Sequence, residues 1–423
     1  MRPRAWVLVL AAVFALLQLA NVTGRDTPDT KNYLAYALSL SGRDKRAAAE
    51  ATIDYVCDGR ASLARRAQSV HVVHFHRPDP TARVTAGCRE REWRTVETRL
   101  RAGQTGGHTV PFMPERFMRI FEVRPGYPAF LVPFVAAFGV TWGLWAASVV
   151  IAAAGGVLAF LVLRTLAVPV PLALTGQALY YVLPCGTTAM RPMTEGLLLA
   201  WTLAALWGGA LALRGRRRAG LVLAGGSLAA LFAVKHSQAL FLGVCLAAAG
   251  ALIAVRRRRR GRPAGREVPA LAAIGAGAAL GTVVLARLLH YPSESDSLQD
   301  LLTGHFARPD REHPWPEFWR LQGNFWGEWL RRQAWQPLFA AALGAGVWGA
   351  LRRPVFGGFL VAAAATGFLT QAAHPDINIW GERLIVLAWL LPVVGIPLLL
   401  EPVARARVPV PAQGHASRPE PVR

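Results

Sequence analysis

The stretch SQALFLGVCLAAAGALIAVRRRRR, residues 237–260, is an apolar run long enough to cross a bilayer, and it ends in consecutive arginines. Similar apolar runs, separated by short gaps that often contain arginine, follow one another along most of the 423-residue chain. With 53% hydrophobic residues, the chain has more apolar surface than an ordinary soluble domain could bury. The pattern therefore predicts an all-α, polytopic membrane protein.

The net charge of +22 could also indicate a nucleic-acid-binding protein. The arginines, however, lie in the gaps between apolar runs, which is the positive-inside arrangement of membrane proteins. We therefore expect membrane lipid, and no nucleic acid, among the partners. The excess of Arg over Lys, together with many Ala, Gly and Val residues, hints at a GC-rich bacterial genome, and we expect the chain in a bacterial inner membrane.

We predict about ten transmembrane helices, each of roughly spanning length. They cover residues 5–22, 142–163, 169–187, 195–213, 219–234, 237–255, 268–289, 336–351, 355–372 and 384–400. Basic clusters then fall on one side of the membrane, at residues 214–218, 256–266, 352–353 and 405–407. The positive-inside rule assigns that side to the cytoplasm, so both termini are expected there.

The predicted helices divide the chain into segments with different roles. Residues 1–22 form the first transmembrane helix, 23–141 a large helical extracytoplasmic loop with juxtamembrane helices, 142–289 transmembrane helices two to seven, 290–335 a Trp-rich extracytoplasmic loop, 336–400 helices eight to ten, and 401–423 a disordered cytoplasmic tail. The apolar run 128–140 is short for a crossing and is interpreted as an interfacial or re-entrant helix. A cleaved signal peptide is the alternative for residues 5–22, although the run is longer than a usual signal core.

The second outer loop is rich in tryptophan. The spacing of Trp315, Trp319, Trp326 and Trp329 places them on one face of a helix, which is typical of a helix that lies in the membrane interface. Such a helix could roof a lipid-donor site, or serve only as an aromatic anchor.

The first outer loop contains cysteines and histidines whose roles the sequence leaves open. Cys57 and Cys88 could form a disulfide in an oxidising compartment, but a sequence gives no geometry for the bond. His71, His74 and His76 invite a metal site, with the last two on one face of a strand. They lack a carboxylate or cysteine at a ligand spacing, so solvated loop histidines are the default. We assign no cofactor, and a divalent metal stays compatible with the sequence.

Two carboxylates follow the first apolar run within a turn or two of the membrane surface, Asp26 and Asp29. A carboxylate in that position can act as a general base, accepting a proton from a hydroxyl that attacks a lipid-borne donor. The simpler alternative is that one of them caps a helix that begins near Thr30.

Basic residues at the predicted outer ends of helices could bind a lipid-borne phosphate, because a polyprenyl phosphate presents its anion at that depth. The candidates are Arg124, Arg191, Lys235, His236 and Arg383. The alternative is that each reaches lipid headgroups or pairs with Glu195 or Glu382.

Four short segments resemble the GT-C superfamily of polyprenyl-phosphate-sugar-dependent glycosyltransferases. They are Asp29 followed by Tyr33, RPGYPAFL at 124–131, RPMTE at 191–195, and GERL at 381–384. The bacterial protein mannosyltransferase-like and aminoarabinose transferase-like members are the most similar in layout. The likeness covers most of the chain in layout, but only these segments in sequence.

The resemblance implies a GT-C-like helical bundle and the transfer of a sugar, such as mannose, from a polyprenyl-phosphate donor. The acceptor, a protein, polysaccharide or glycolipid, is on the outer face, and the anomeric carbon is inverted. Asp29 would be the first candidate for the catalytic base and Asp26 the second, although the chain lacks the neighbouring acidic pair of some members. The matching segments add substrate-loop candidates, namely Tyr33, Tyr127, Glu195 and Glu382.

Two other classes of function are compatible with a polytopic chain. A transporter or lipid flippase is expected to show repeat symmetry and charges near mid-membrane, whereas the charges here gather at predicted helix ends. A non-catalytic scaffold of the cell envelope would use Asp29 only as a helix cap.

Overall fold

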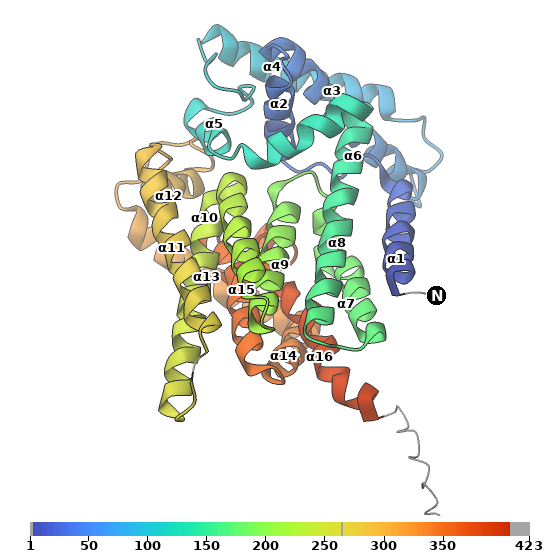
Figure 1. Cartoon of the computed structure of the whole chain (residues 1–423). Helices are drawn as coiled ribbons and strands as arrows, with labels where there is room; N and C mark the ends of the chain where they lie inside the picture. The colour runs from blue at the N-terminus through green and yellow to red at the C-terminus, as the bar shows by residue number, and fades with distance from the viewer. Residues whose placement is uncertain (1–2, 264, 407–423) are drawn as a thin grey trace, which may run out of the picture.

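The computed structural model describes residues 3–263 and 265–406, and the regular secondary structure in them is helical, as predicted (Figure 1). The α-helices are α1 Pro3–Gln18, α2 Thr30–Leu40, α3 Lys45–Ser69, α4 Thr81–Arg101, α5 Glu115–Glu122, α6 Gly126–Thr165, α7 Val170–Val182, α8 Pro184–Ala189, α9 Thr194–Leu213, α10 Arg217–Arg259, α11 Glu267–Leu288, α12 Glu294–Thr303, α13 Pro314–Trp335, α14 Leu338–Leu351, α15 Pro354–Ala373 and α16 Leu390–Ala406. Short 3₁₀ helices cover Leu19–Asn21, Ile377–Ile379 and Leu384–Trp389.

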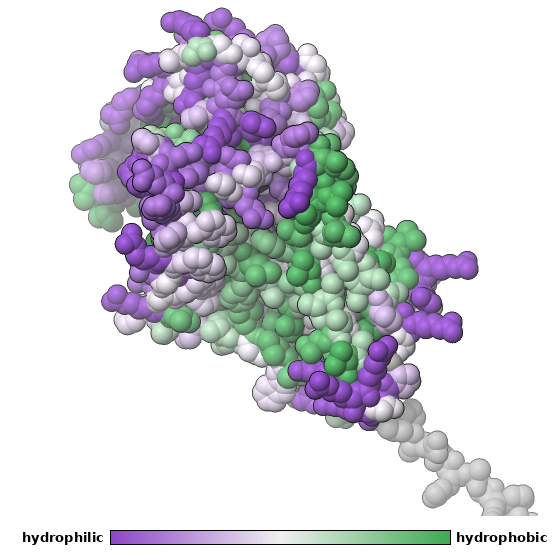
Figure 2. All heavy atoms as spheres, turned by 90° about the vertical axis from the view of Figure 1, so that its left-hand side faces the viewer, coloured by the Kyte–Doolittle hydropathy of each residue, from purple (hydrophilic) through white to green (hydrophobic). Residues whose placement is uncertain are grey.

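The molecule has two layers. A bundle of apolar helices lies below a helical head, residues 23–125, which contains α2 to α5 (Figure 1). Figure 2 shows a hydrophobic band across the visible face of the bundle, between the hydrophilic head and hydrophilic patches at the opposite end. We call that opposite end, where α9, α10 and α14 meet arginine clusters, the basic end.

Seven helical segments in the described residues are long and apolar enough to cross a membrane. They are Pro3–Asn21, Gly126–Thr165, Thr194–Leu213, Arg217–Arg259, Glu267–Leu288, Pro354–Ala373 and Ile377–Ala406, and Leu338–Leu351 is a shorter apolar helix. Length and composition thus identify a multi-pass helical membrane protein.

Helix α10 is much longer than a membrane crossing, and it is broken at Lys235, where the backbone is extended at φ −163° and ψ 96°. Before the break, Gly220 lies against Gly208 of α9. After the break, Gly243 lies against Gly275 of α11, and Gly250 against Ala272. The first half of α10 leaves the basic end beside α9, and the second half returns to it beside α11. The chain therefore reverses direction at Lys235. The break falls between the predicted runs 219–234 and 237–255. The glycines on each side of it allow α9 and α11 to approach α10 closely.

Helix α6 contains a second break, at Gly139, whose φ of +73° favours glycine. The part before Gly139 lies across the top of the bundle, and the part after it runs down the bundle (Figure 1). This division matches the predicted juxtamembrane run 128–140 and the predicted span 142–163.

Three predicted boundaries are wrong. Residues 169–187 do not form one helix, because α7 ends at Val182, before Pro184, whose ring cannot continue an α-helix. The last span begins as the 3₁₀ helix Leu384–Trp389 and becomes α-helical only at Leu390. The predicted tail does not begin at residue 401, since α16 continues to Ala406; the rest of that segment, 407–423, lies outside the described residues.

Buried Glu401 explains why α16 continues. Its carboxylate accepts hydrogen bonds from Arg353 at 2.9 Å and from Arg405 at 2.7 Å, which fix the last turn to the start of α15. Arg405 also donates to the carbonyl of Ala167 at 2.9 Å. Charge-assisted bonds of this kind hold a helix end at the membrane surface.

The head is held together covalently as well as by packing. A disulfide joins Cys57 of α3 to Cys88 of α4, so the alternative that the sequence left open is settled. Asp44 accepts hydrogen bonds from the backbone of Arg46 and Ala47, and thereby caps α3. The buried residues of the head belong to the same hydrophobic core as those of the bundle, and this packing holds the segment from Gly24 to Tyr33 above the bundle.

Candidate functional site

A chain of charged side chains lies where the head meets the bundle. Arg383, which precedes the last helix, pairs with Asp29 at the start of α2, and its Nε lies 3.3 Å from Oε1 of Glu195 in the first turn of α9. Glu195 is almost completely buried, and the other two side chains are mostly buried. Buried charges persist only when they are paired, so this contact brings together elements far apart in the sequence.

The alternative that Asp29 caps α2 is not what the structure shows. Asp29 occupies the N-cap position, but its side chain accepts no backbone hydrogen bond there. Its carboxylate is bound by Arg383 instead. The structure therefore leaves Asp29 available as a charged group of the site and not as a structural cap.

Two hydroxyl groups fix the loops around this contact. The hydroxyl of Thr30 donates to the carbonyl of Pro192 at 3.0 Å, and that of Thr188 donates to the carbonyl of Glu382 at 2.9 Å. Arg191 pairs with the side chain of Glu382 at 2.9 Å, on the exposed rim. Of the alternatives that the sequence left open, pairing with a glutamate is therefore present for Arg191, with Glu382, and for Arg383, with Glu195.

Lys235 lies at the turn of α10 and faces the same region. Lys235 interacts electrostatically with Glu195 and Arg124. His236 interacts electrostatically with Arg124 and Lys235. Within the described residues, the ammonium group of Lys235 makes no hydrogen bond. The close approach of Gly126 to the backbone at Ala233, where a Cβ would come within 2.8 Å, holds this turn against the start of α6.

The two tyrosines that the sequence selected are next to this group. Arg124 Nη1 donates to the hydroxyl of Tyr33 at 3.3 Å, and the rings of Tyr33 and Tyr127 meet edge to face at 5.4 Å. The hydroxyl of Tyr127, Nε of Arg124 and Nδ1 of His236 are buried without a hydrogen-bond partner among the described residues. Buried polar atoms are rarely left unpaired, so these atoms are candidates for contact with a ligand.

Asp26 is the one candidate that the structure places apart. It lies beside α3, where its carboxylate is next to Gly59 and is an electrostatic neighbour of Arg60 and Tyr55. Burial raises the pKa of Asp26 above its usual value. Although Asp26 and Asp29 are close in sequence, only Asp29 contacts Arg383.

A cavity of about 610 Å³ opens beside Arg383, and we call it the arginine cavity. Its residues are Val182, Leu183, Pro184, Arg191, Gln333, Gln336, Leu338, Phe339, Asn378, Ile379, Trp380, Gly381, Glu382, Arg383 and Trp389. The volume is within the range of about 300–1,000 Å³ that is usual for small-molecule sites. One part carries charged side chains and another is apolar, and its apolar residues Val182 and Leu338 are exposed on the surface of the bundle.

Sequence reasoning missed two of the polar residues that line this cavity, Trp389 and Gln333. Nε1 of Trp389 and Oε1 of Gln333 are buried and have no hydrogen-bond partner in the described chain. Neither residue carries a sequence signal, because tryptophan and glutamine in or beside apolar helices are usual packing or anchoring residues.

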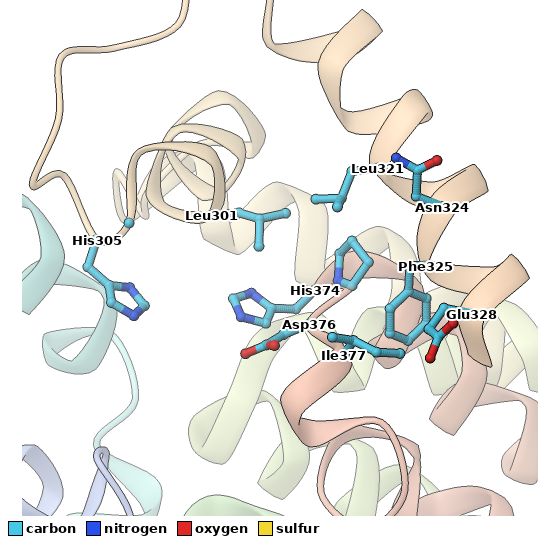
Figure 3. Close-up of a pocket in the computed structure, with 11 residues that line it drawn as sticks. Leu301, His305, Leu321, Asn324, Phe325, Glu328, His374, Asp376 and Ile377 are labelled. Atoms are coloured by element: carbon cyan, nitrogen blue, oxygen red, sulfur yellow. The ribbon is translucent and has the colours of Figure 1, made fainter. Parts of the chain in front are cut away.

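A second pocket, of about 420 Å³, is lined by residues 374–377, next in the chain to the residues 378–383 that line the arginine cavity, and we call it the histidine pocket. Figure 3 shows His305 facing His374 and Asp376 across it. Nδ1 of His305 lies 3.0 Å from Asp300, and this hydrogen bond raises the pKa of His305, whereas burial lowers the pKa of His374. No sequence pattern predicted this pocket, since it joins α12, α13 and the residues after α15.

The tryptophan helix is present as α13, but its aromatic face is not uniformly exposed. Trp315 and Trp319 are exposed, whereas Trp329 is buried against Phe339 and Phe368. The face with Trp315 and Trp319 is thus the part that can meet an interface, whereas Trp329 belongs to the core.

The histidines of the head are in turns and not in a strand, and the rings of His71 and His74 stack at 4.2 Å. In the described part of the chain, no group of three or more His, Cys, Asp or Glu residues is placed to hold a metal ion. The chain matches no protein-family model, no curated protein and no solved structure.

Proposed function

We propose that this protein is an integral-membrane glycosyltransferase of the GT-C type, which transfers a hexose such as mannose from a polyprenyl-phosphate donor to an acceptor on the outer face of a bacterial cell membrane. The observation that carries the proposal is the arginine cavity beside Asp29, charged in one part and apolar in another. A lipid-linked sugar phosphate has the same two-part chemistry.

The donor phosphate would bind Arg383 and Arg191, since guanidinium groups form paired hydrogen bonds with phosphate oxygens. The indole N–H of Trp389 is a further donor without a partner in the described chain. The polyprenyl chain would pass Val182 and Leu338, which are exposed on the apolar surface, and so reach the lipid.

The reaction follows from these positions. An acceptor hydroxyl attacks the anomeric carbon, Asp29 takes its proton, and the bond between that carbon and the phosphate oxygen breaks with inversion. Polyprenyl phosphate leaves with the bonding electrons, and Arg383, Arg191 and Lys235 stabilise its charge. Pairing with Arg383 orients the carboxylate of Asp29 before the acceptor arrives.

The acceptor would approach from the histidine pocket. His374 is an electrostatic neighbour of Lys235, which connects this pocket to the charged group. Protein, polysaccharide and glycolipid acceptors all offer the hydroxyl that the reaction needs.

The same proposal assigns a topology with ten crossings. The two halves of α10 count as separate crossings, as do α1, the later part of α6, α7 with α8, α9, α11, α14, α15 and the last helix. The basic end would then be cytoplasmic, together with both termini, and the head extracytoplasmic. The disulfide in the head supports this orientation, since disulfides persist in oxidising compartments.

Sugar transfer in membranes supplied with radiolabelled polyprenyl-phosphate sugars tests the proposal. Asp29→Asn should abolish transfer at matched expression, because the amide cannot accept the proton, whereas Asp26→Asn should retain it. Glu401→Gln is a matched control, since Glu401 forms a similar arginine pair at the basic end.

Another acid at position 29 separates catalysis from structure. Asp29→Glu keeps a carboxylate that can pair with Arg383 and accept the proton, whereas Asp29→Asn keeps the size but not the charge. Asp29→Glu should retain part of the transfer, and full transfer in Asp29→Asn would show that Asp29 has only a structural role. If the unsubstituted protein transfers no sugar but moves labelled lipid across the bilayer, the flippase alternative replaces the transferase.

A further inference from the structure

The loop between α3 and α4 carries an apolar surface that the transferase proposal does not use. In the turns at residues 70–77, Val70, Val72, Val73 and Phe75 have relative exposures of 80%, 87%, 61% and 62%. Singly exposed apolar residues are ordinary, but four large ones within six positions form a continuous patch. Described residues elsewhere in the chain leave these side chains uncovered.

Contacts along α3 place this loop near the membrane. Gly59 meets Gly24, the hydroxyl of Thr23 lies 3.3 Å from that of Ser62, and Arg66 binds Asn21 at the end of α1. As α3 advances, its contacts thus move back along the chain toward the first apolar helix. Figure 1 shows the loop beside the upper end of α1.

The loop continues the lipid-facing surface of α1. Leu16, Leu17 and Leu19, near the upper end of that helix, are exposed, and little of α1 is covered by the rest of the protein. The exposed side chains of the loop follow directly after the last α3 residues that touch this end.

The backbone of the loop is suited to enter an apolar interface. The N–H of Phe75 donates to the carbonyl of His71 at 2.9 Å, and that of Arg77 donates to His74 at 3.0 Å. The amide of Gln68 donates to the carbonyl of Arg77 at 2.9 Å. Because these groups pair within the loop, its apolar tip can enter lipid with a lower desolvation cost.

A basic groove of about 550 Å³ adjoins the tip, and it is lined by His71, His74, Arg77 and Arg83. Its single acidic residue, Asp79, accepts hydrogen bonds from the backbone and hydroxyl of Thr81, and these lower the pKa of its carboxyl. The groove thus offers donors and positive charge at the height of the lipid headgroups.

We infer that this loop is a lipid-binding element: its apolar tip inserts into the outer leaflet, and the basic groove binds the phosphate of an anionic phospholipid. The inference uses only the membrane placement of α1 and does not depend on sugar transfer. It gives the head a third attachment to the membrane, in addition to α1 and α6.

The test uses a nitroxide spin label on Val72→Cys in nanodiscs of equal parts phosphatidylcholine and phosphatidylglycerol. The label should be more accessible to oxygen, which dissolves in lipid, than to a water-soluble nickel chelate. The same label on Arg94→Cys, on the exposed face of α4, should show the reverse. Unsubstituted protein reports background labelling of Cys185 and Cys245.

Equal access of the nickel chelate to both labelled sites would overturn insertion. In detergent, the label on Val72→Cys could instead become less accessible to the nickel chelate as the protein concentration rises. That result would also overturn insertion, since a second copy of the chain would then cover the patch. Insertion should be shallower in phosphatidylcholine alone, and Arg77→Gln with Arg83→Gln should remove this difference. If depth does not depend on the anionic lipid, the headgroup site is wrong.

Discussion

Arg383 connects three parts of the chain, because its guanidinium group contacts Asp29 of the head and Glu195 of the bundle. Glu195 has 5% side-chain exposure, so its charge depends on this partner. The rim pair of Arg191 and Glu382 looks similar in sequence but is much more exposed, and water already stabilises both of its charges.

We expect Arg383→Gln to lower the free energy of unfolding by about 3 kcal/mol, as for other buried ion pairs that lose one partner. Arg191→Gln should change it by less than about 1 kcal/mol. Denaturant unfolding of the purified proteins in detergent measures both. Equal losses would show that the two pairs are equally screened by water.

The pH dependence of stability distinguishes Asp26 from other acids of the head. Burial raises the pKa of Asp26 in the folded protein above its value in the unfolded chain. The protonated carboxyl therefore stabilises the fold at low pH, and this stabilisation is lost as the pH rises through the folded-state pKa. Asp26→Asn should therefore raise the unfolding temperature at pH 8 but not near pH 4. Asp58→Asn, at an exposed position of α3, should have no such pH-dependent effect.

At the scale of elements, the two long helices are built around breaks. Lys235 and Gly139 divide α10 and α6 into shorter pieces, and the contacts of both helices depend on the direction that the chain takes there. At φ +73° and ψ 178°, the break in α6 lies in a backbone region that is essentially limited to glycine and costs residues with a side chain about 1–3 kcal/mol.

Gly139→Ala should lower the free energy of unfolding by about 1–2 kcal/mol, although no neighbouring atom lies within 4 Å of the added Cβ. Gly281→Ala is the matched control, since Gly281 is helical and equally open. Alanine there should be neutral or stabilising by up to about 1 kcal/mol. Detergent unfolding compares the two, and an unchanged Gly139→Ala would show that the break does not need the left-handed conformation.

At the scale of the whole molecule, the two ends of the bundle carry different sets of charged residues. The basic end carries arginines at the ends of α9, α10 and α14, whereas the site and the histidine pocket lie at the head. The turn at Lys235 produces this division, because it returns the arginines after residue 255 to the same end as residues 214–218.

Cysteine labelling in spheroplasts tests this arrangement. A membrane-impermeant maleimide should label Arg94→Cys in the head, but should label Arg216→Cys and Arg260→Cys only after the membrane is permeabilised. Cysteines at the two ends of α10 must behave alike if the helix turns back. Opposite behaviour would mean that α10 crosses the membrane once.

The sequence by itself determined the helical class, the approximate helix positions and the two breaks, because hydrophobic length and arginine spacing are local properties that lipid selects directly. It also selected most of the charged residues that meet at the site, since charge at the end of an apolar helix is costly and visible. It could not decide whether Asp29 caps a helix, whether Cys57 pairs with Cys88, or where Asp26 lies.

Only the tertiary structure decided those points, together with the arginine cavity and the histidine pocket. Each depends on side chains from different elements, which are 31 residues apart for Cys57 and Cys88 and 354 residues apart for Asp29 and Arg383. Trp389 and Gln333 gain their role in the same way. Packing fixes distances that no local pattern encodes, and the chemistry of a site depends on those distances.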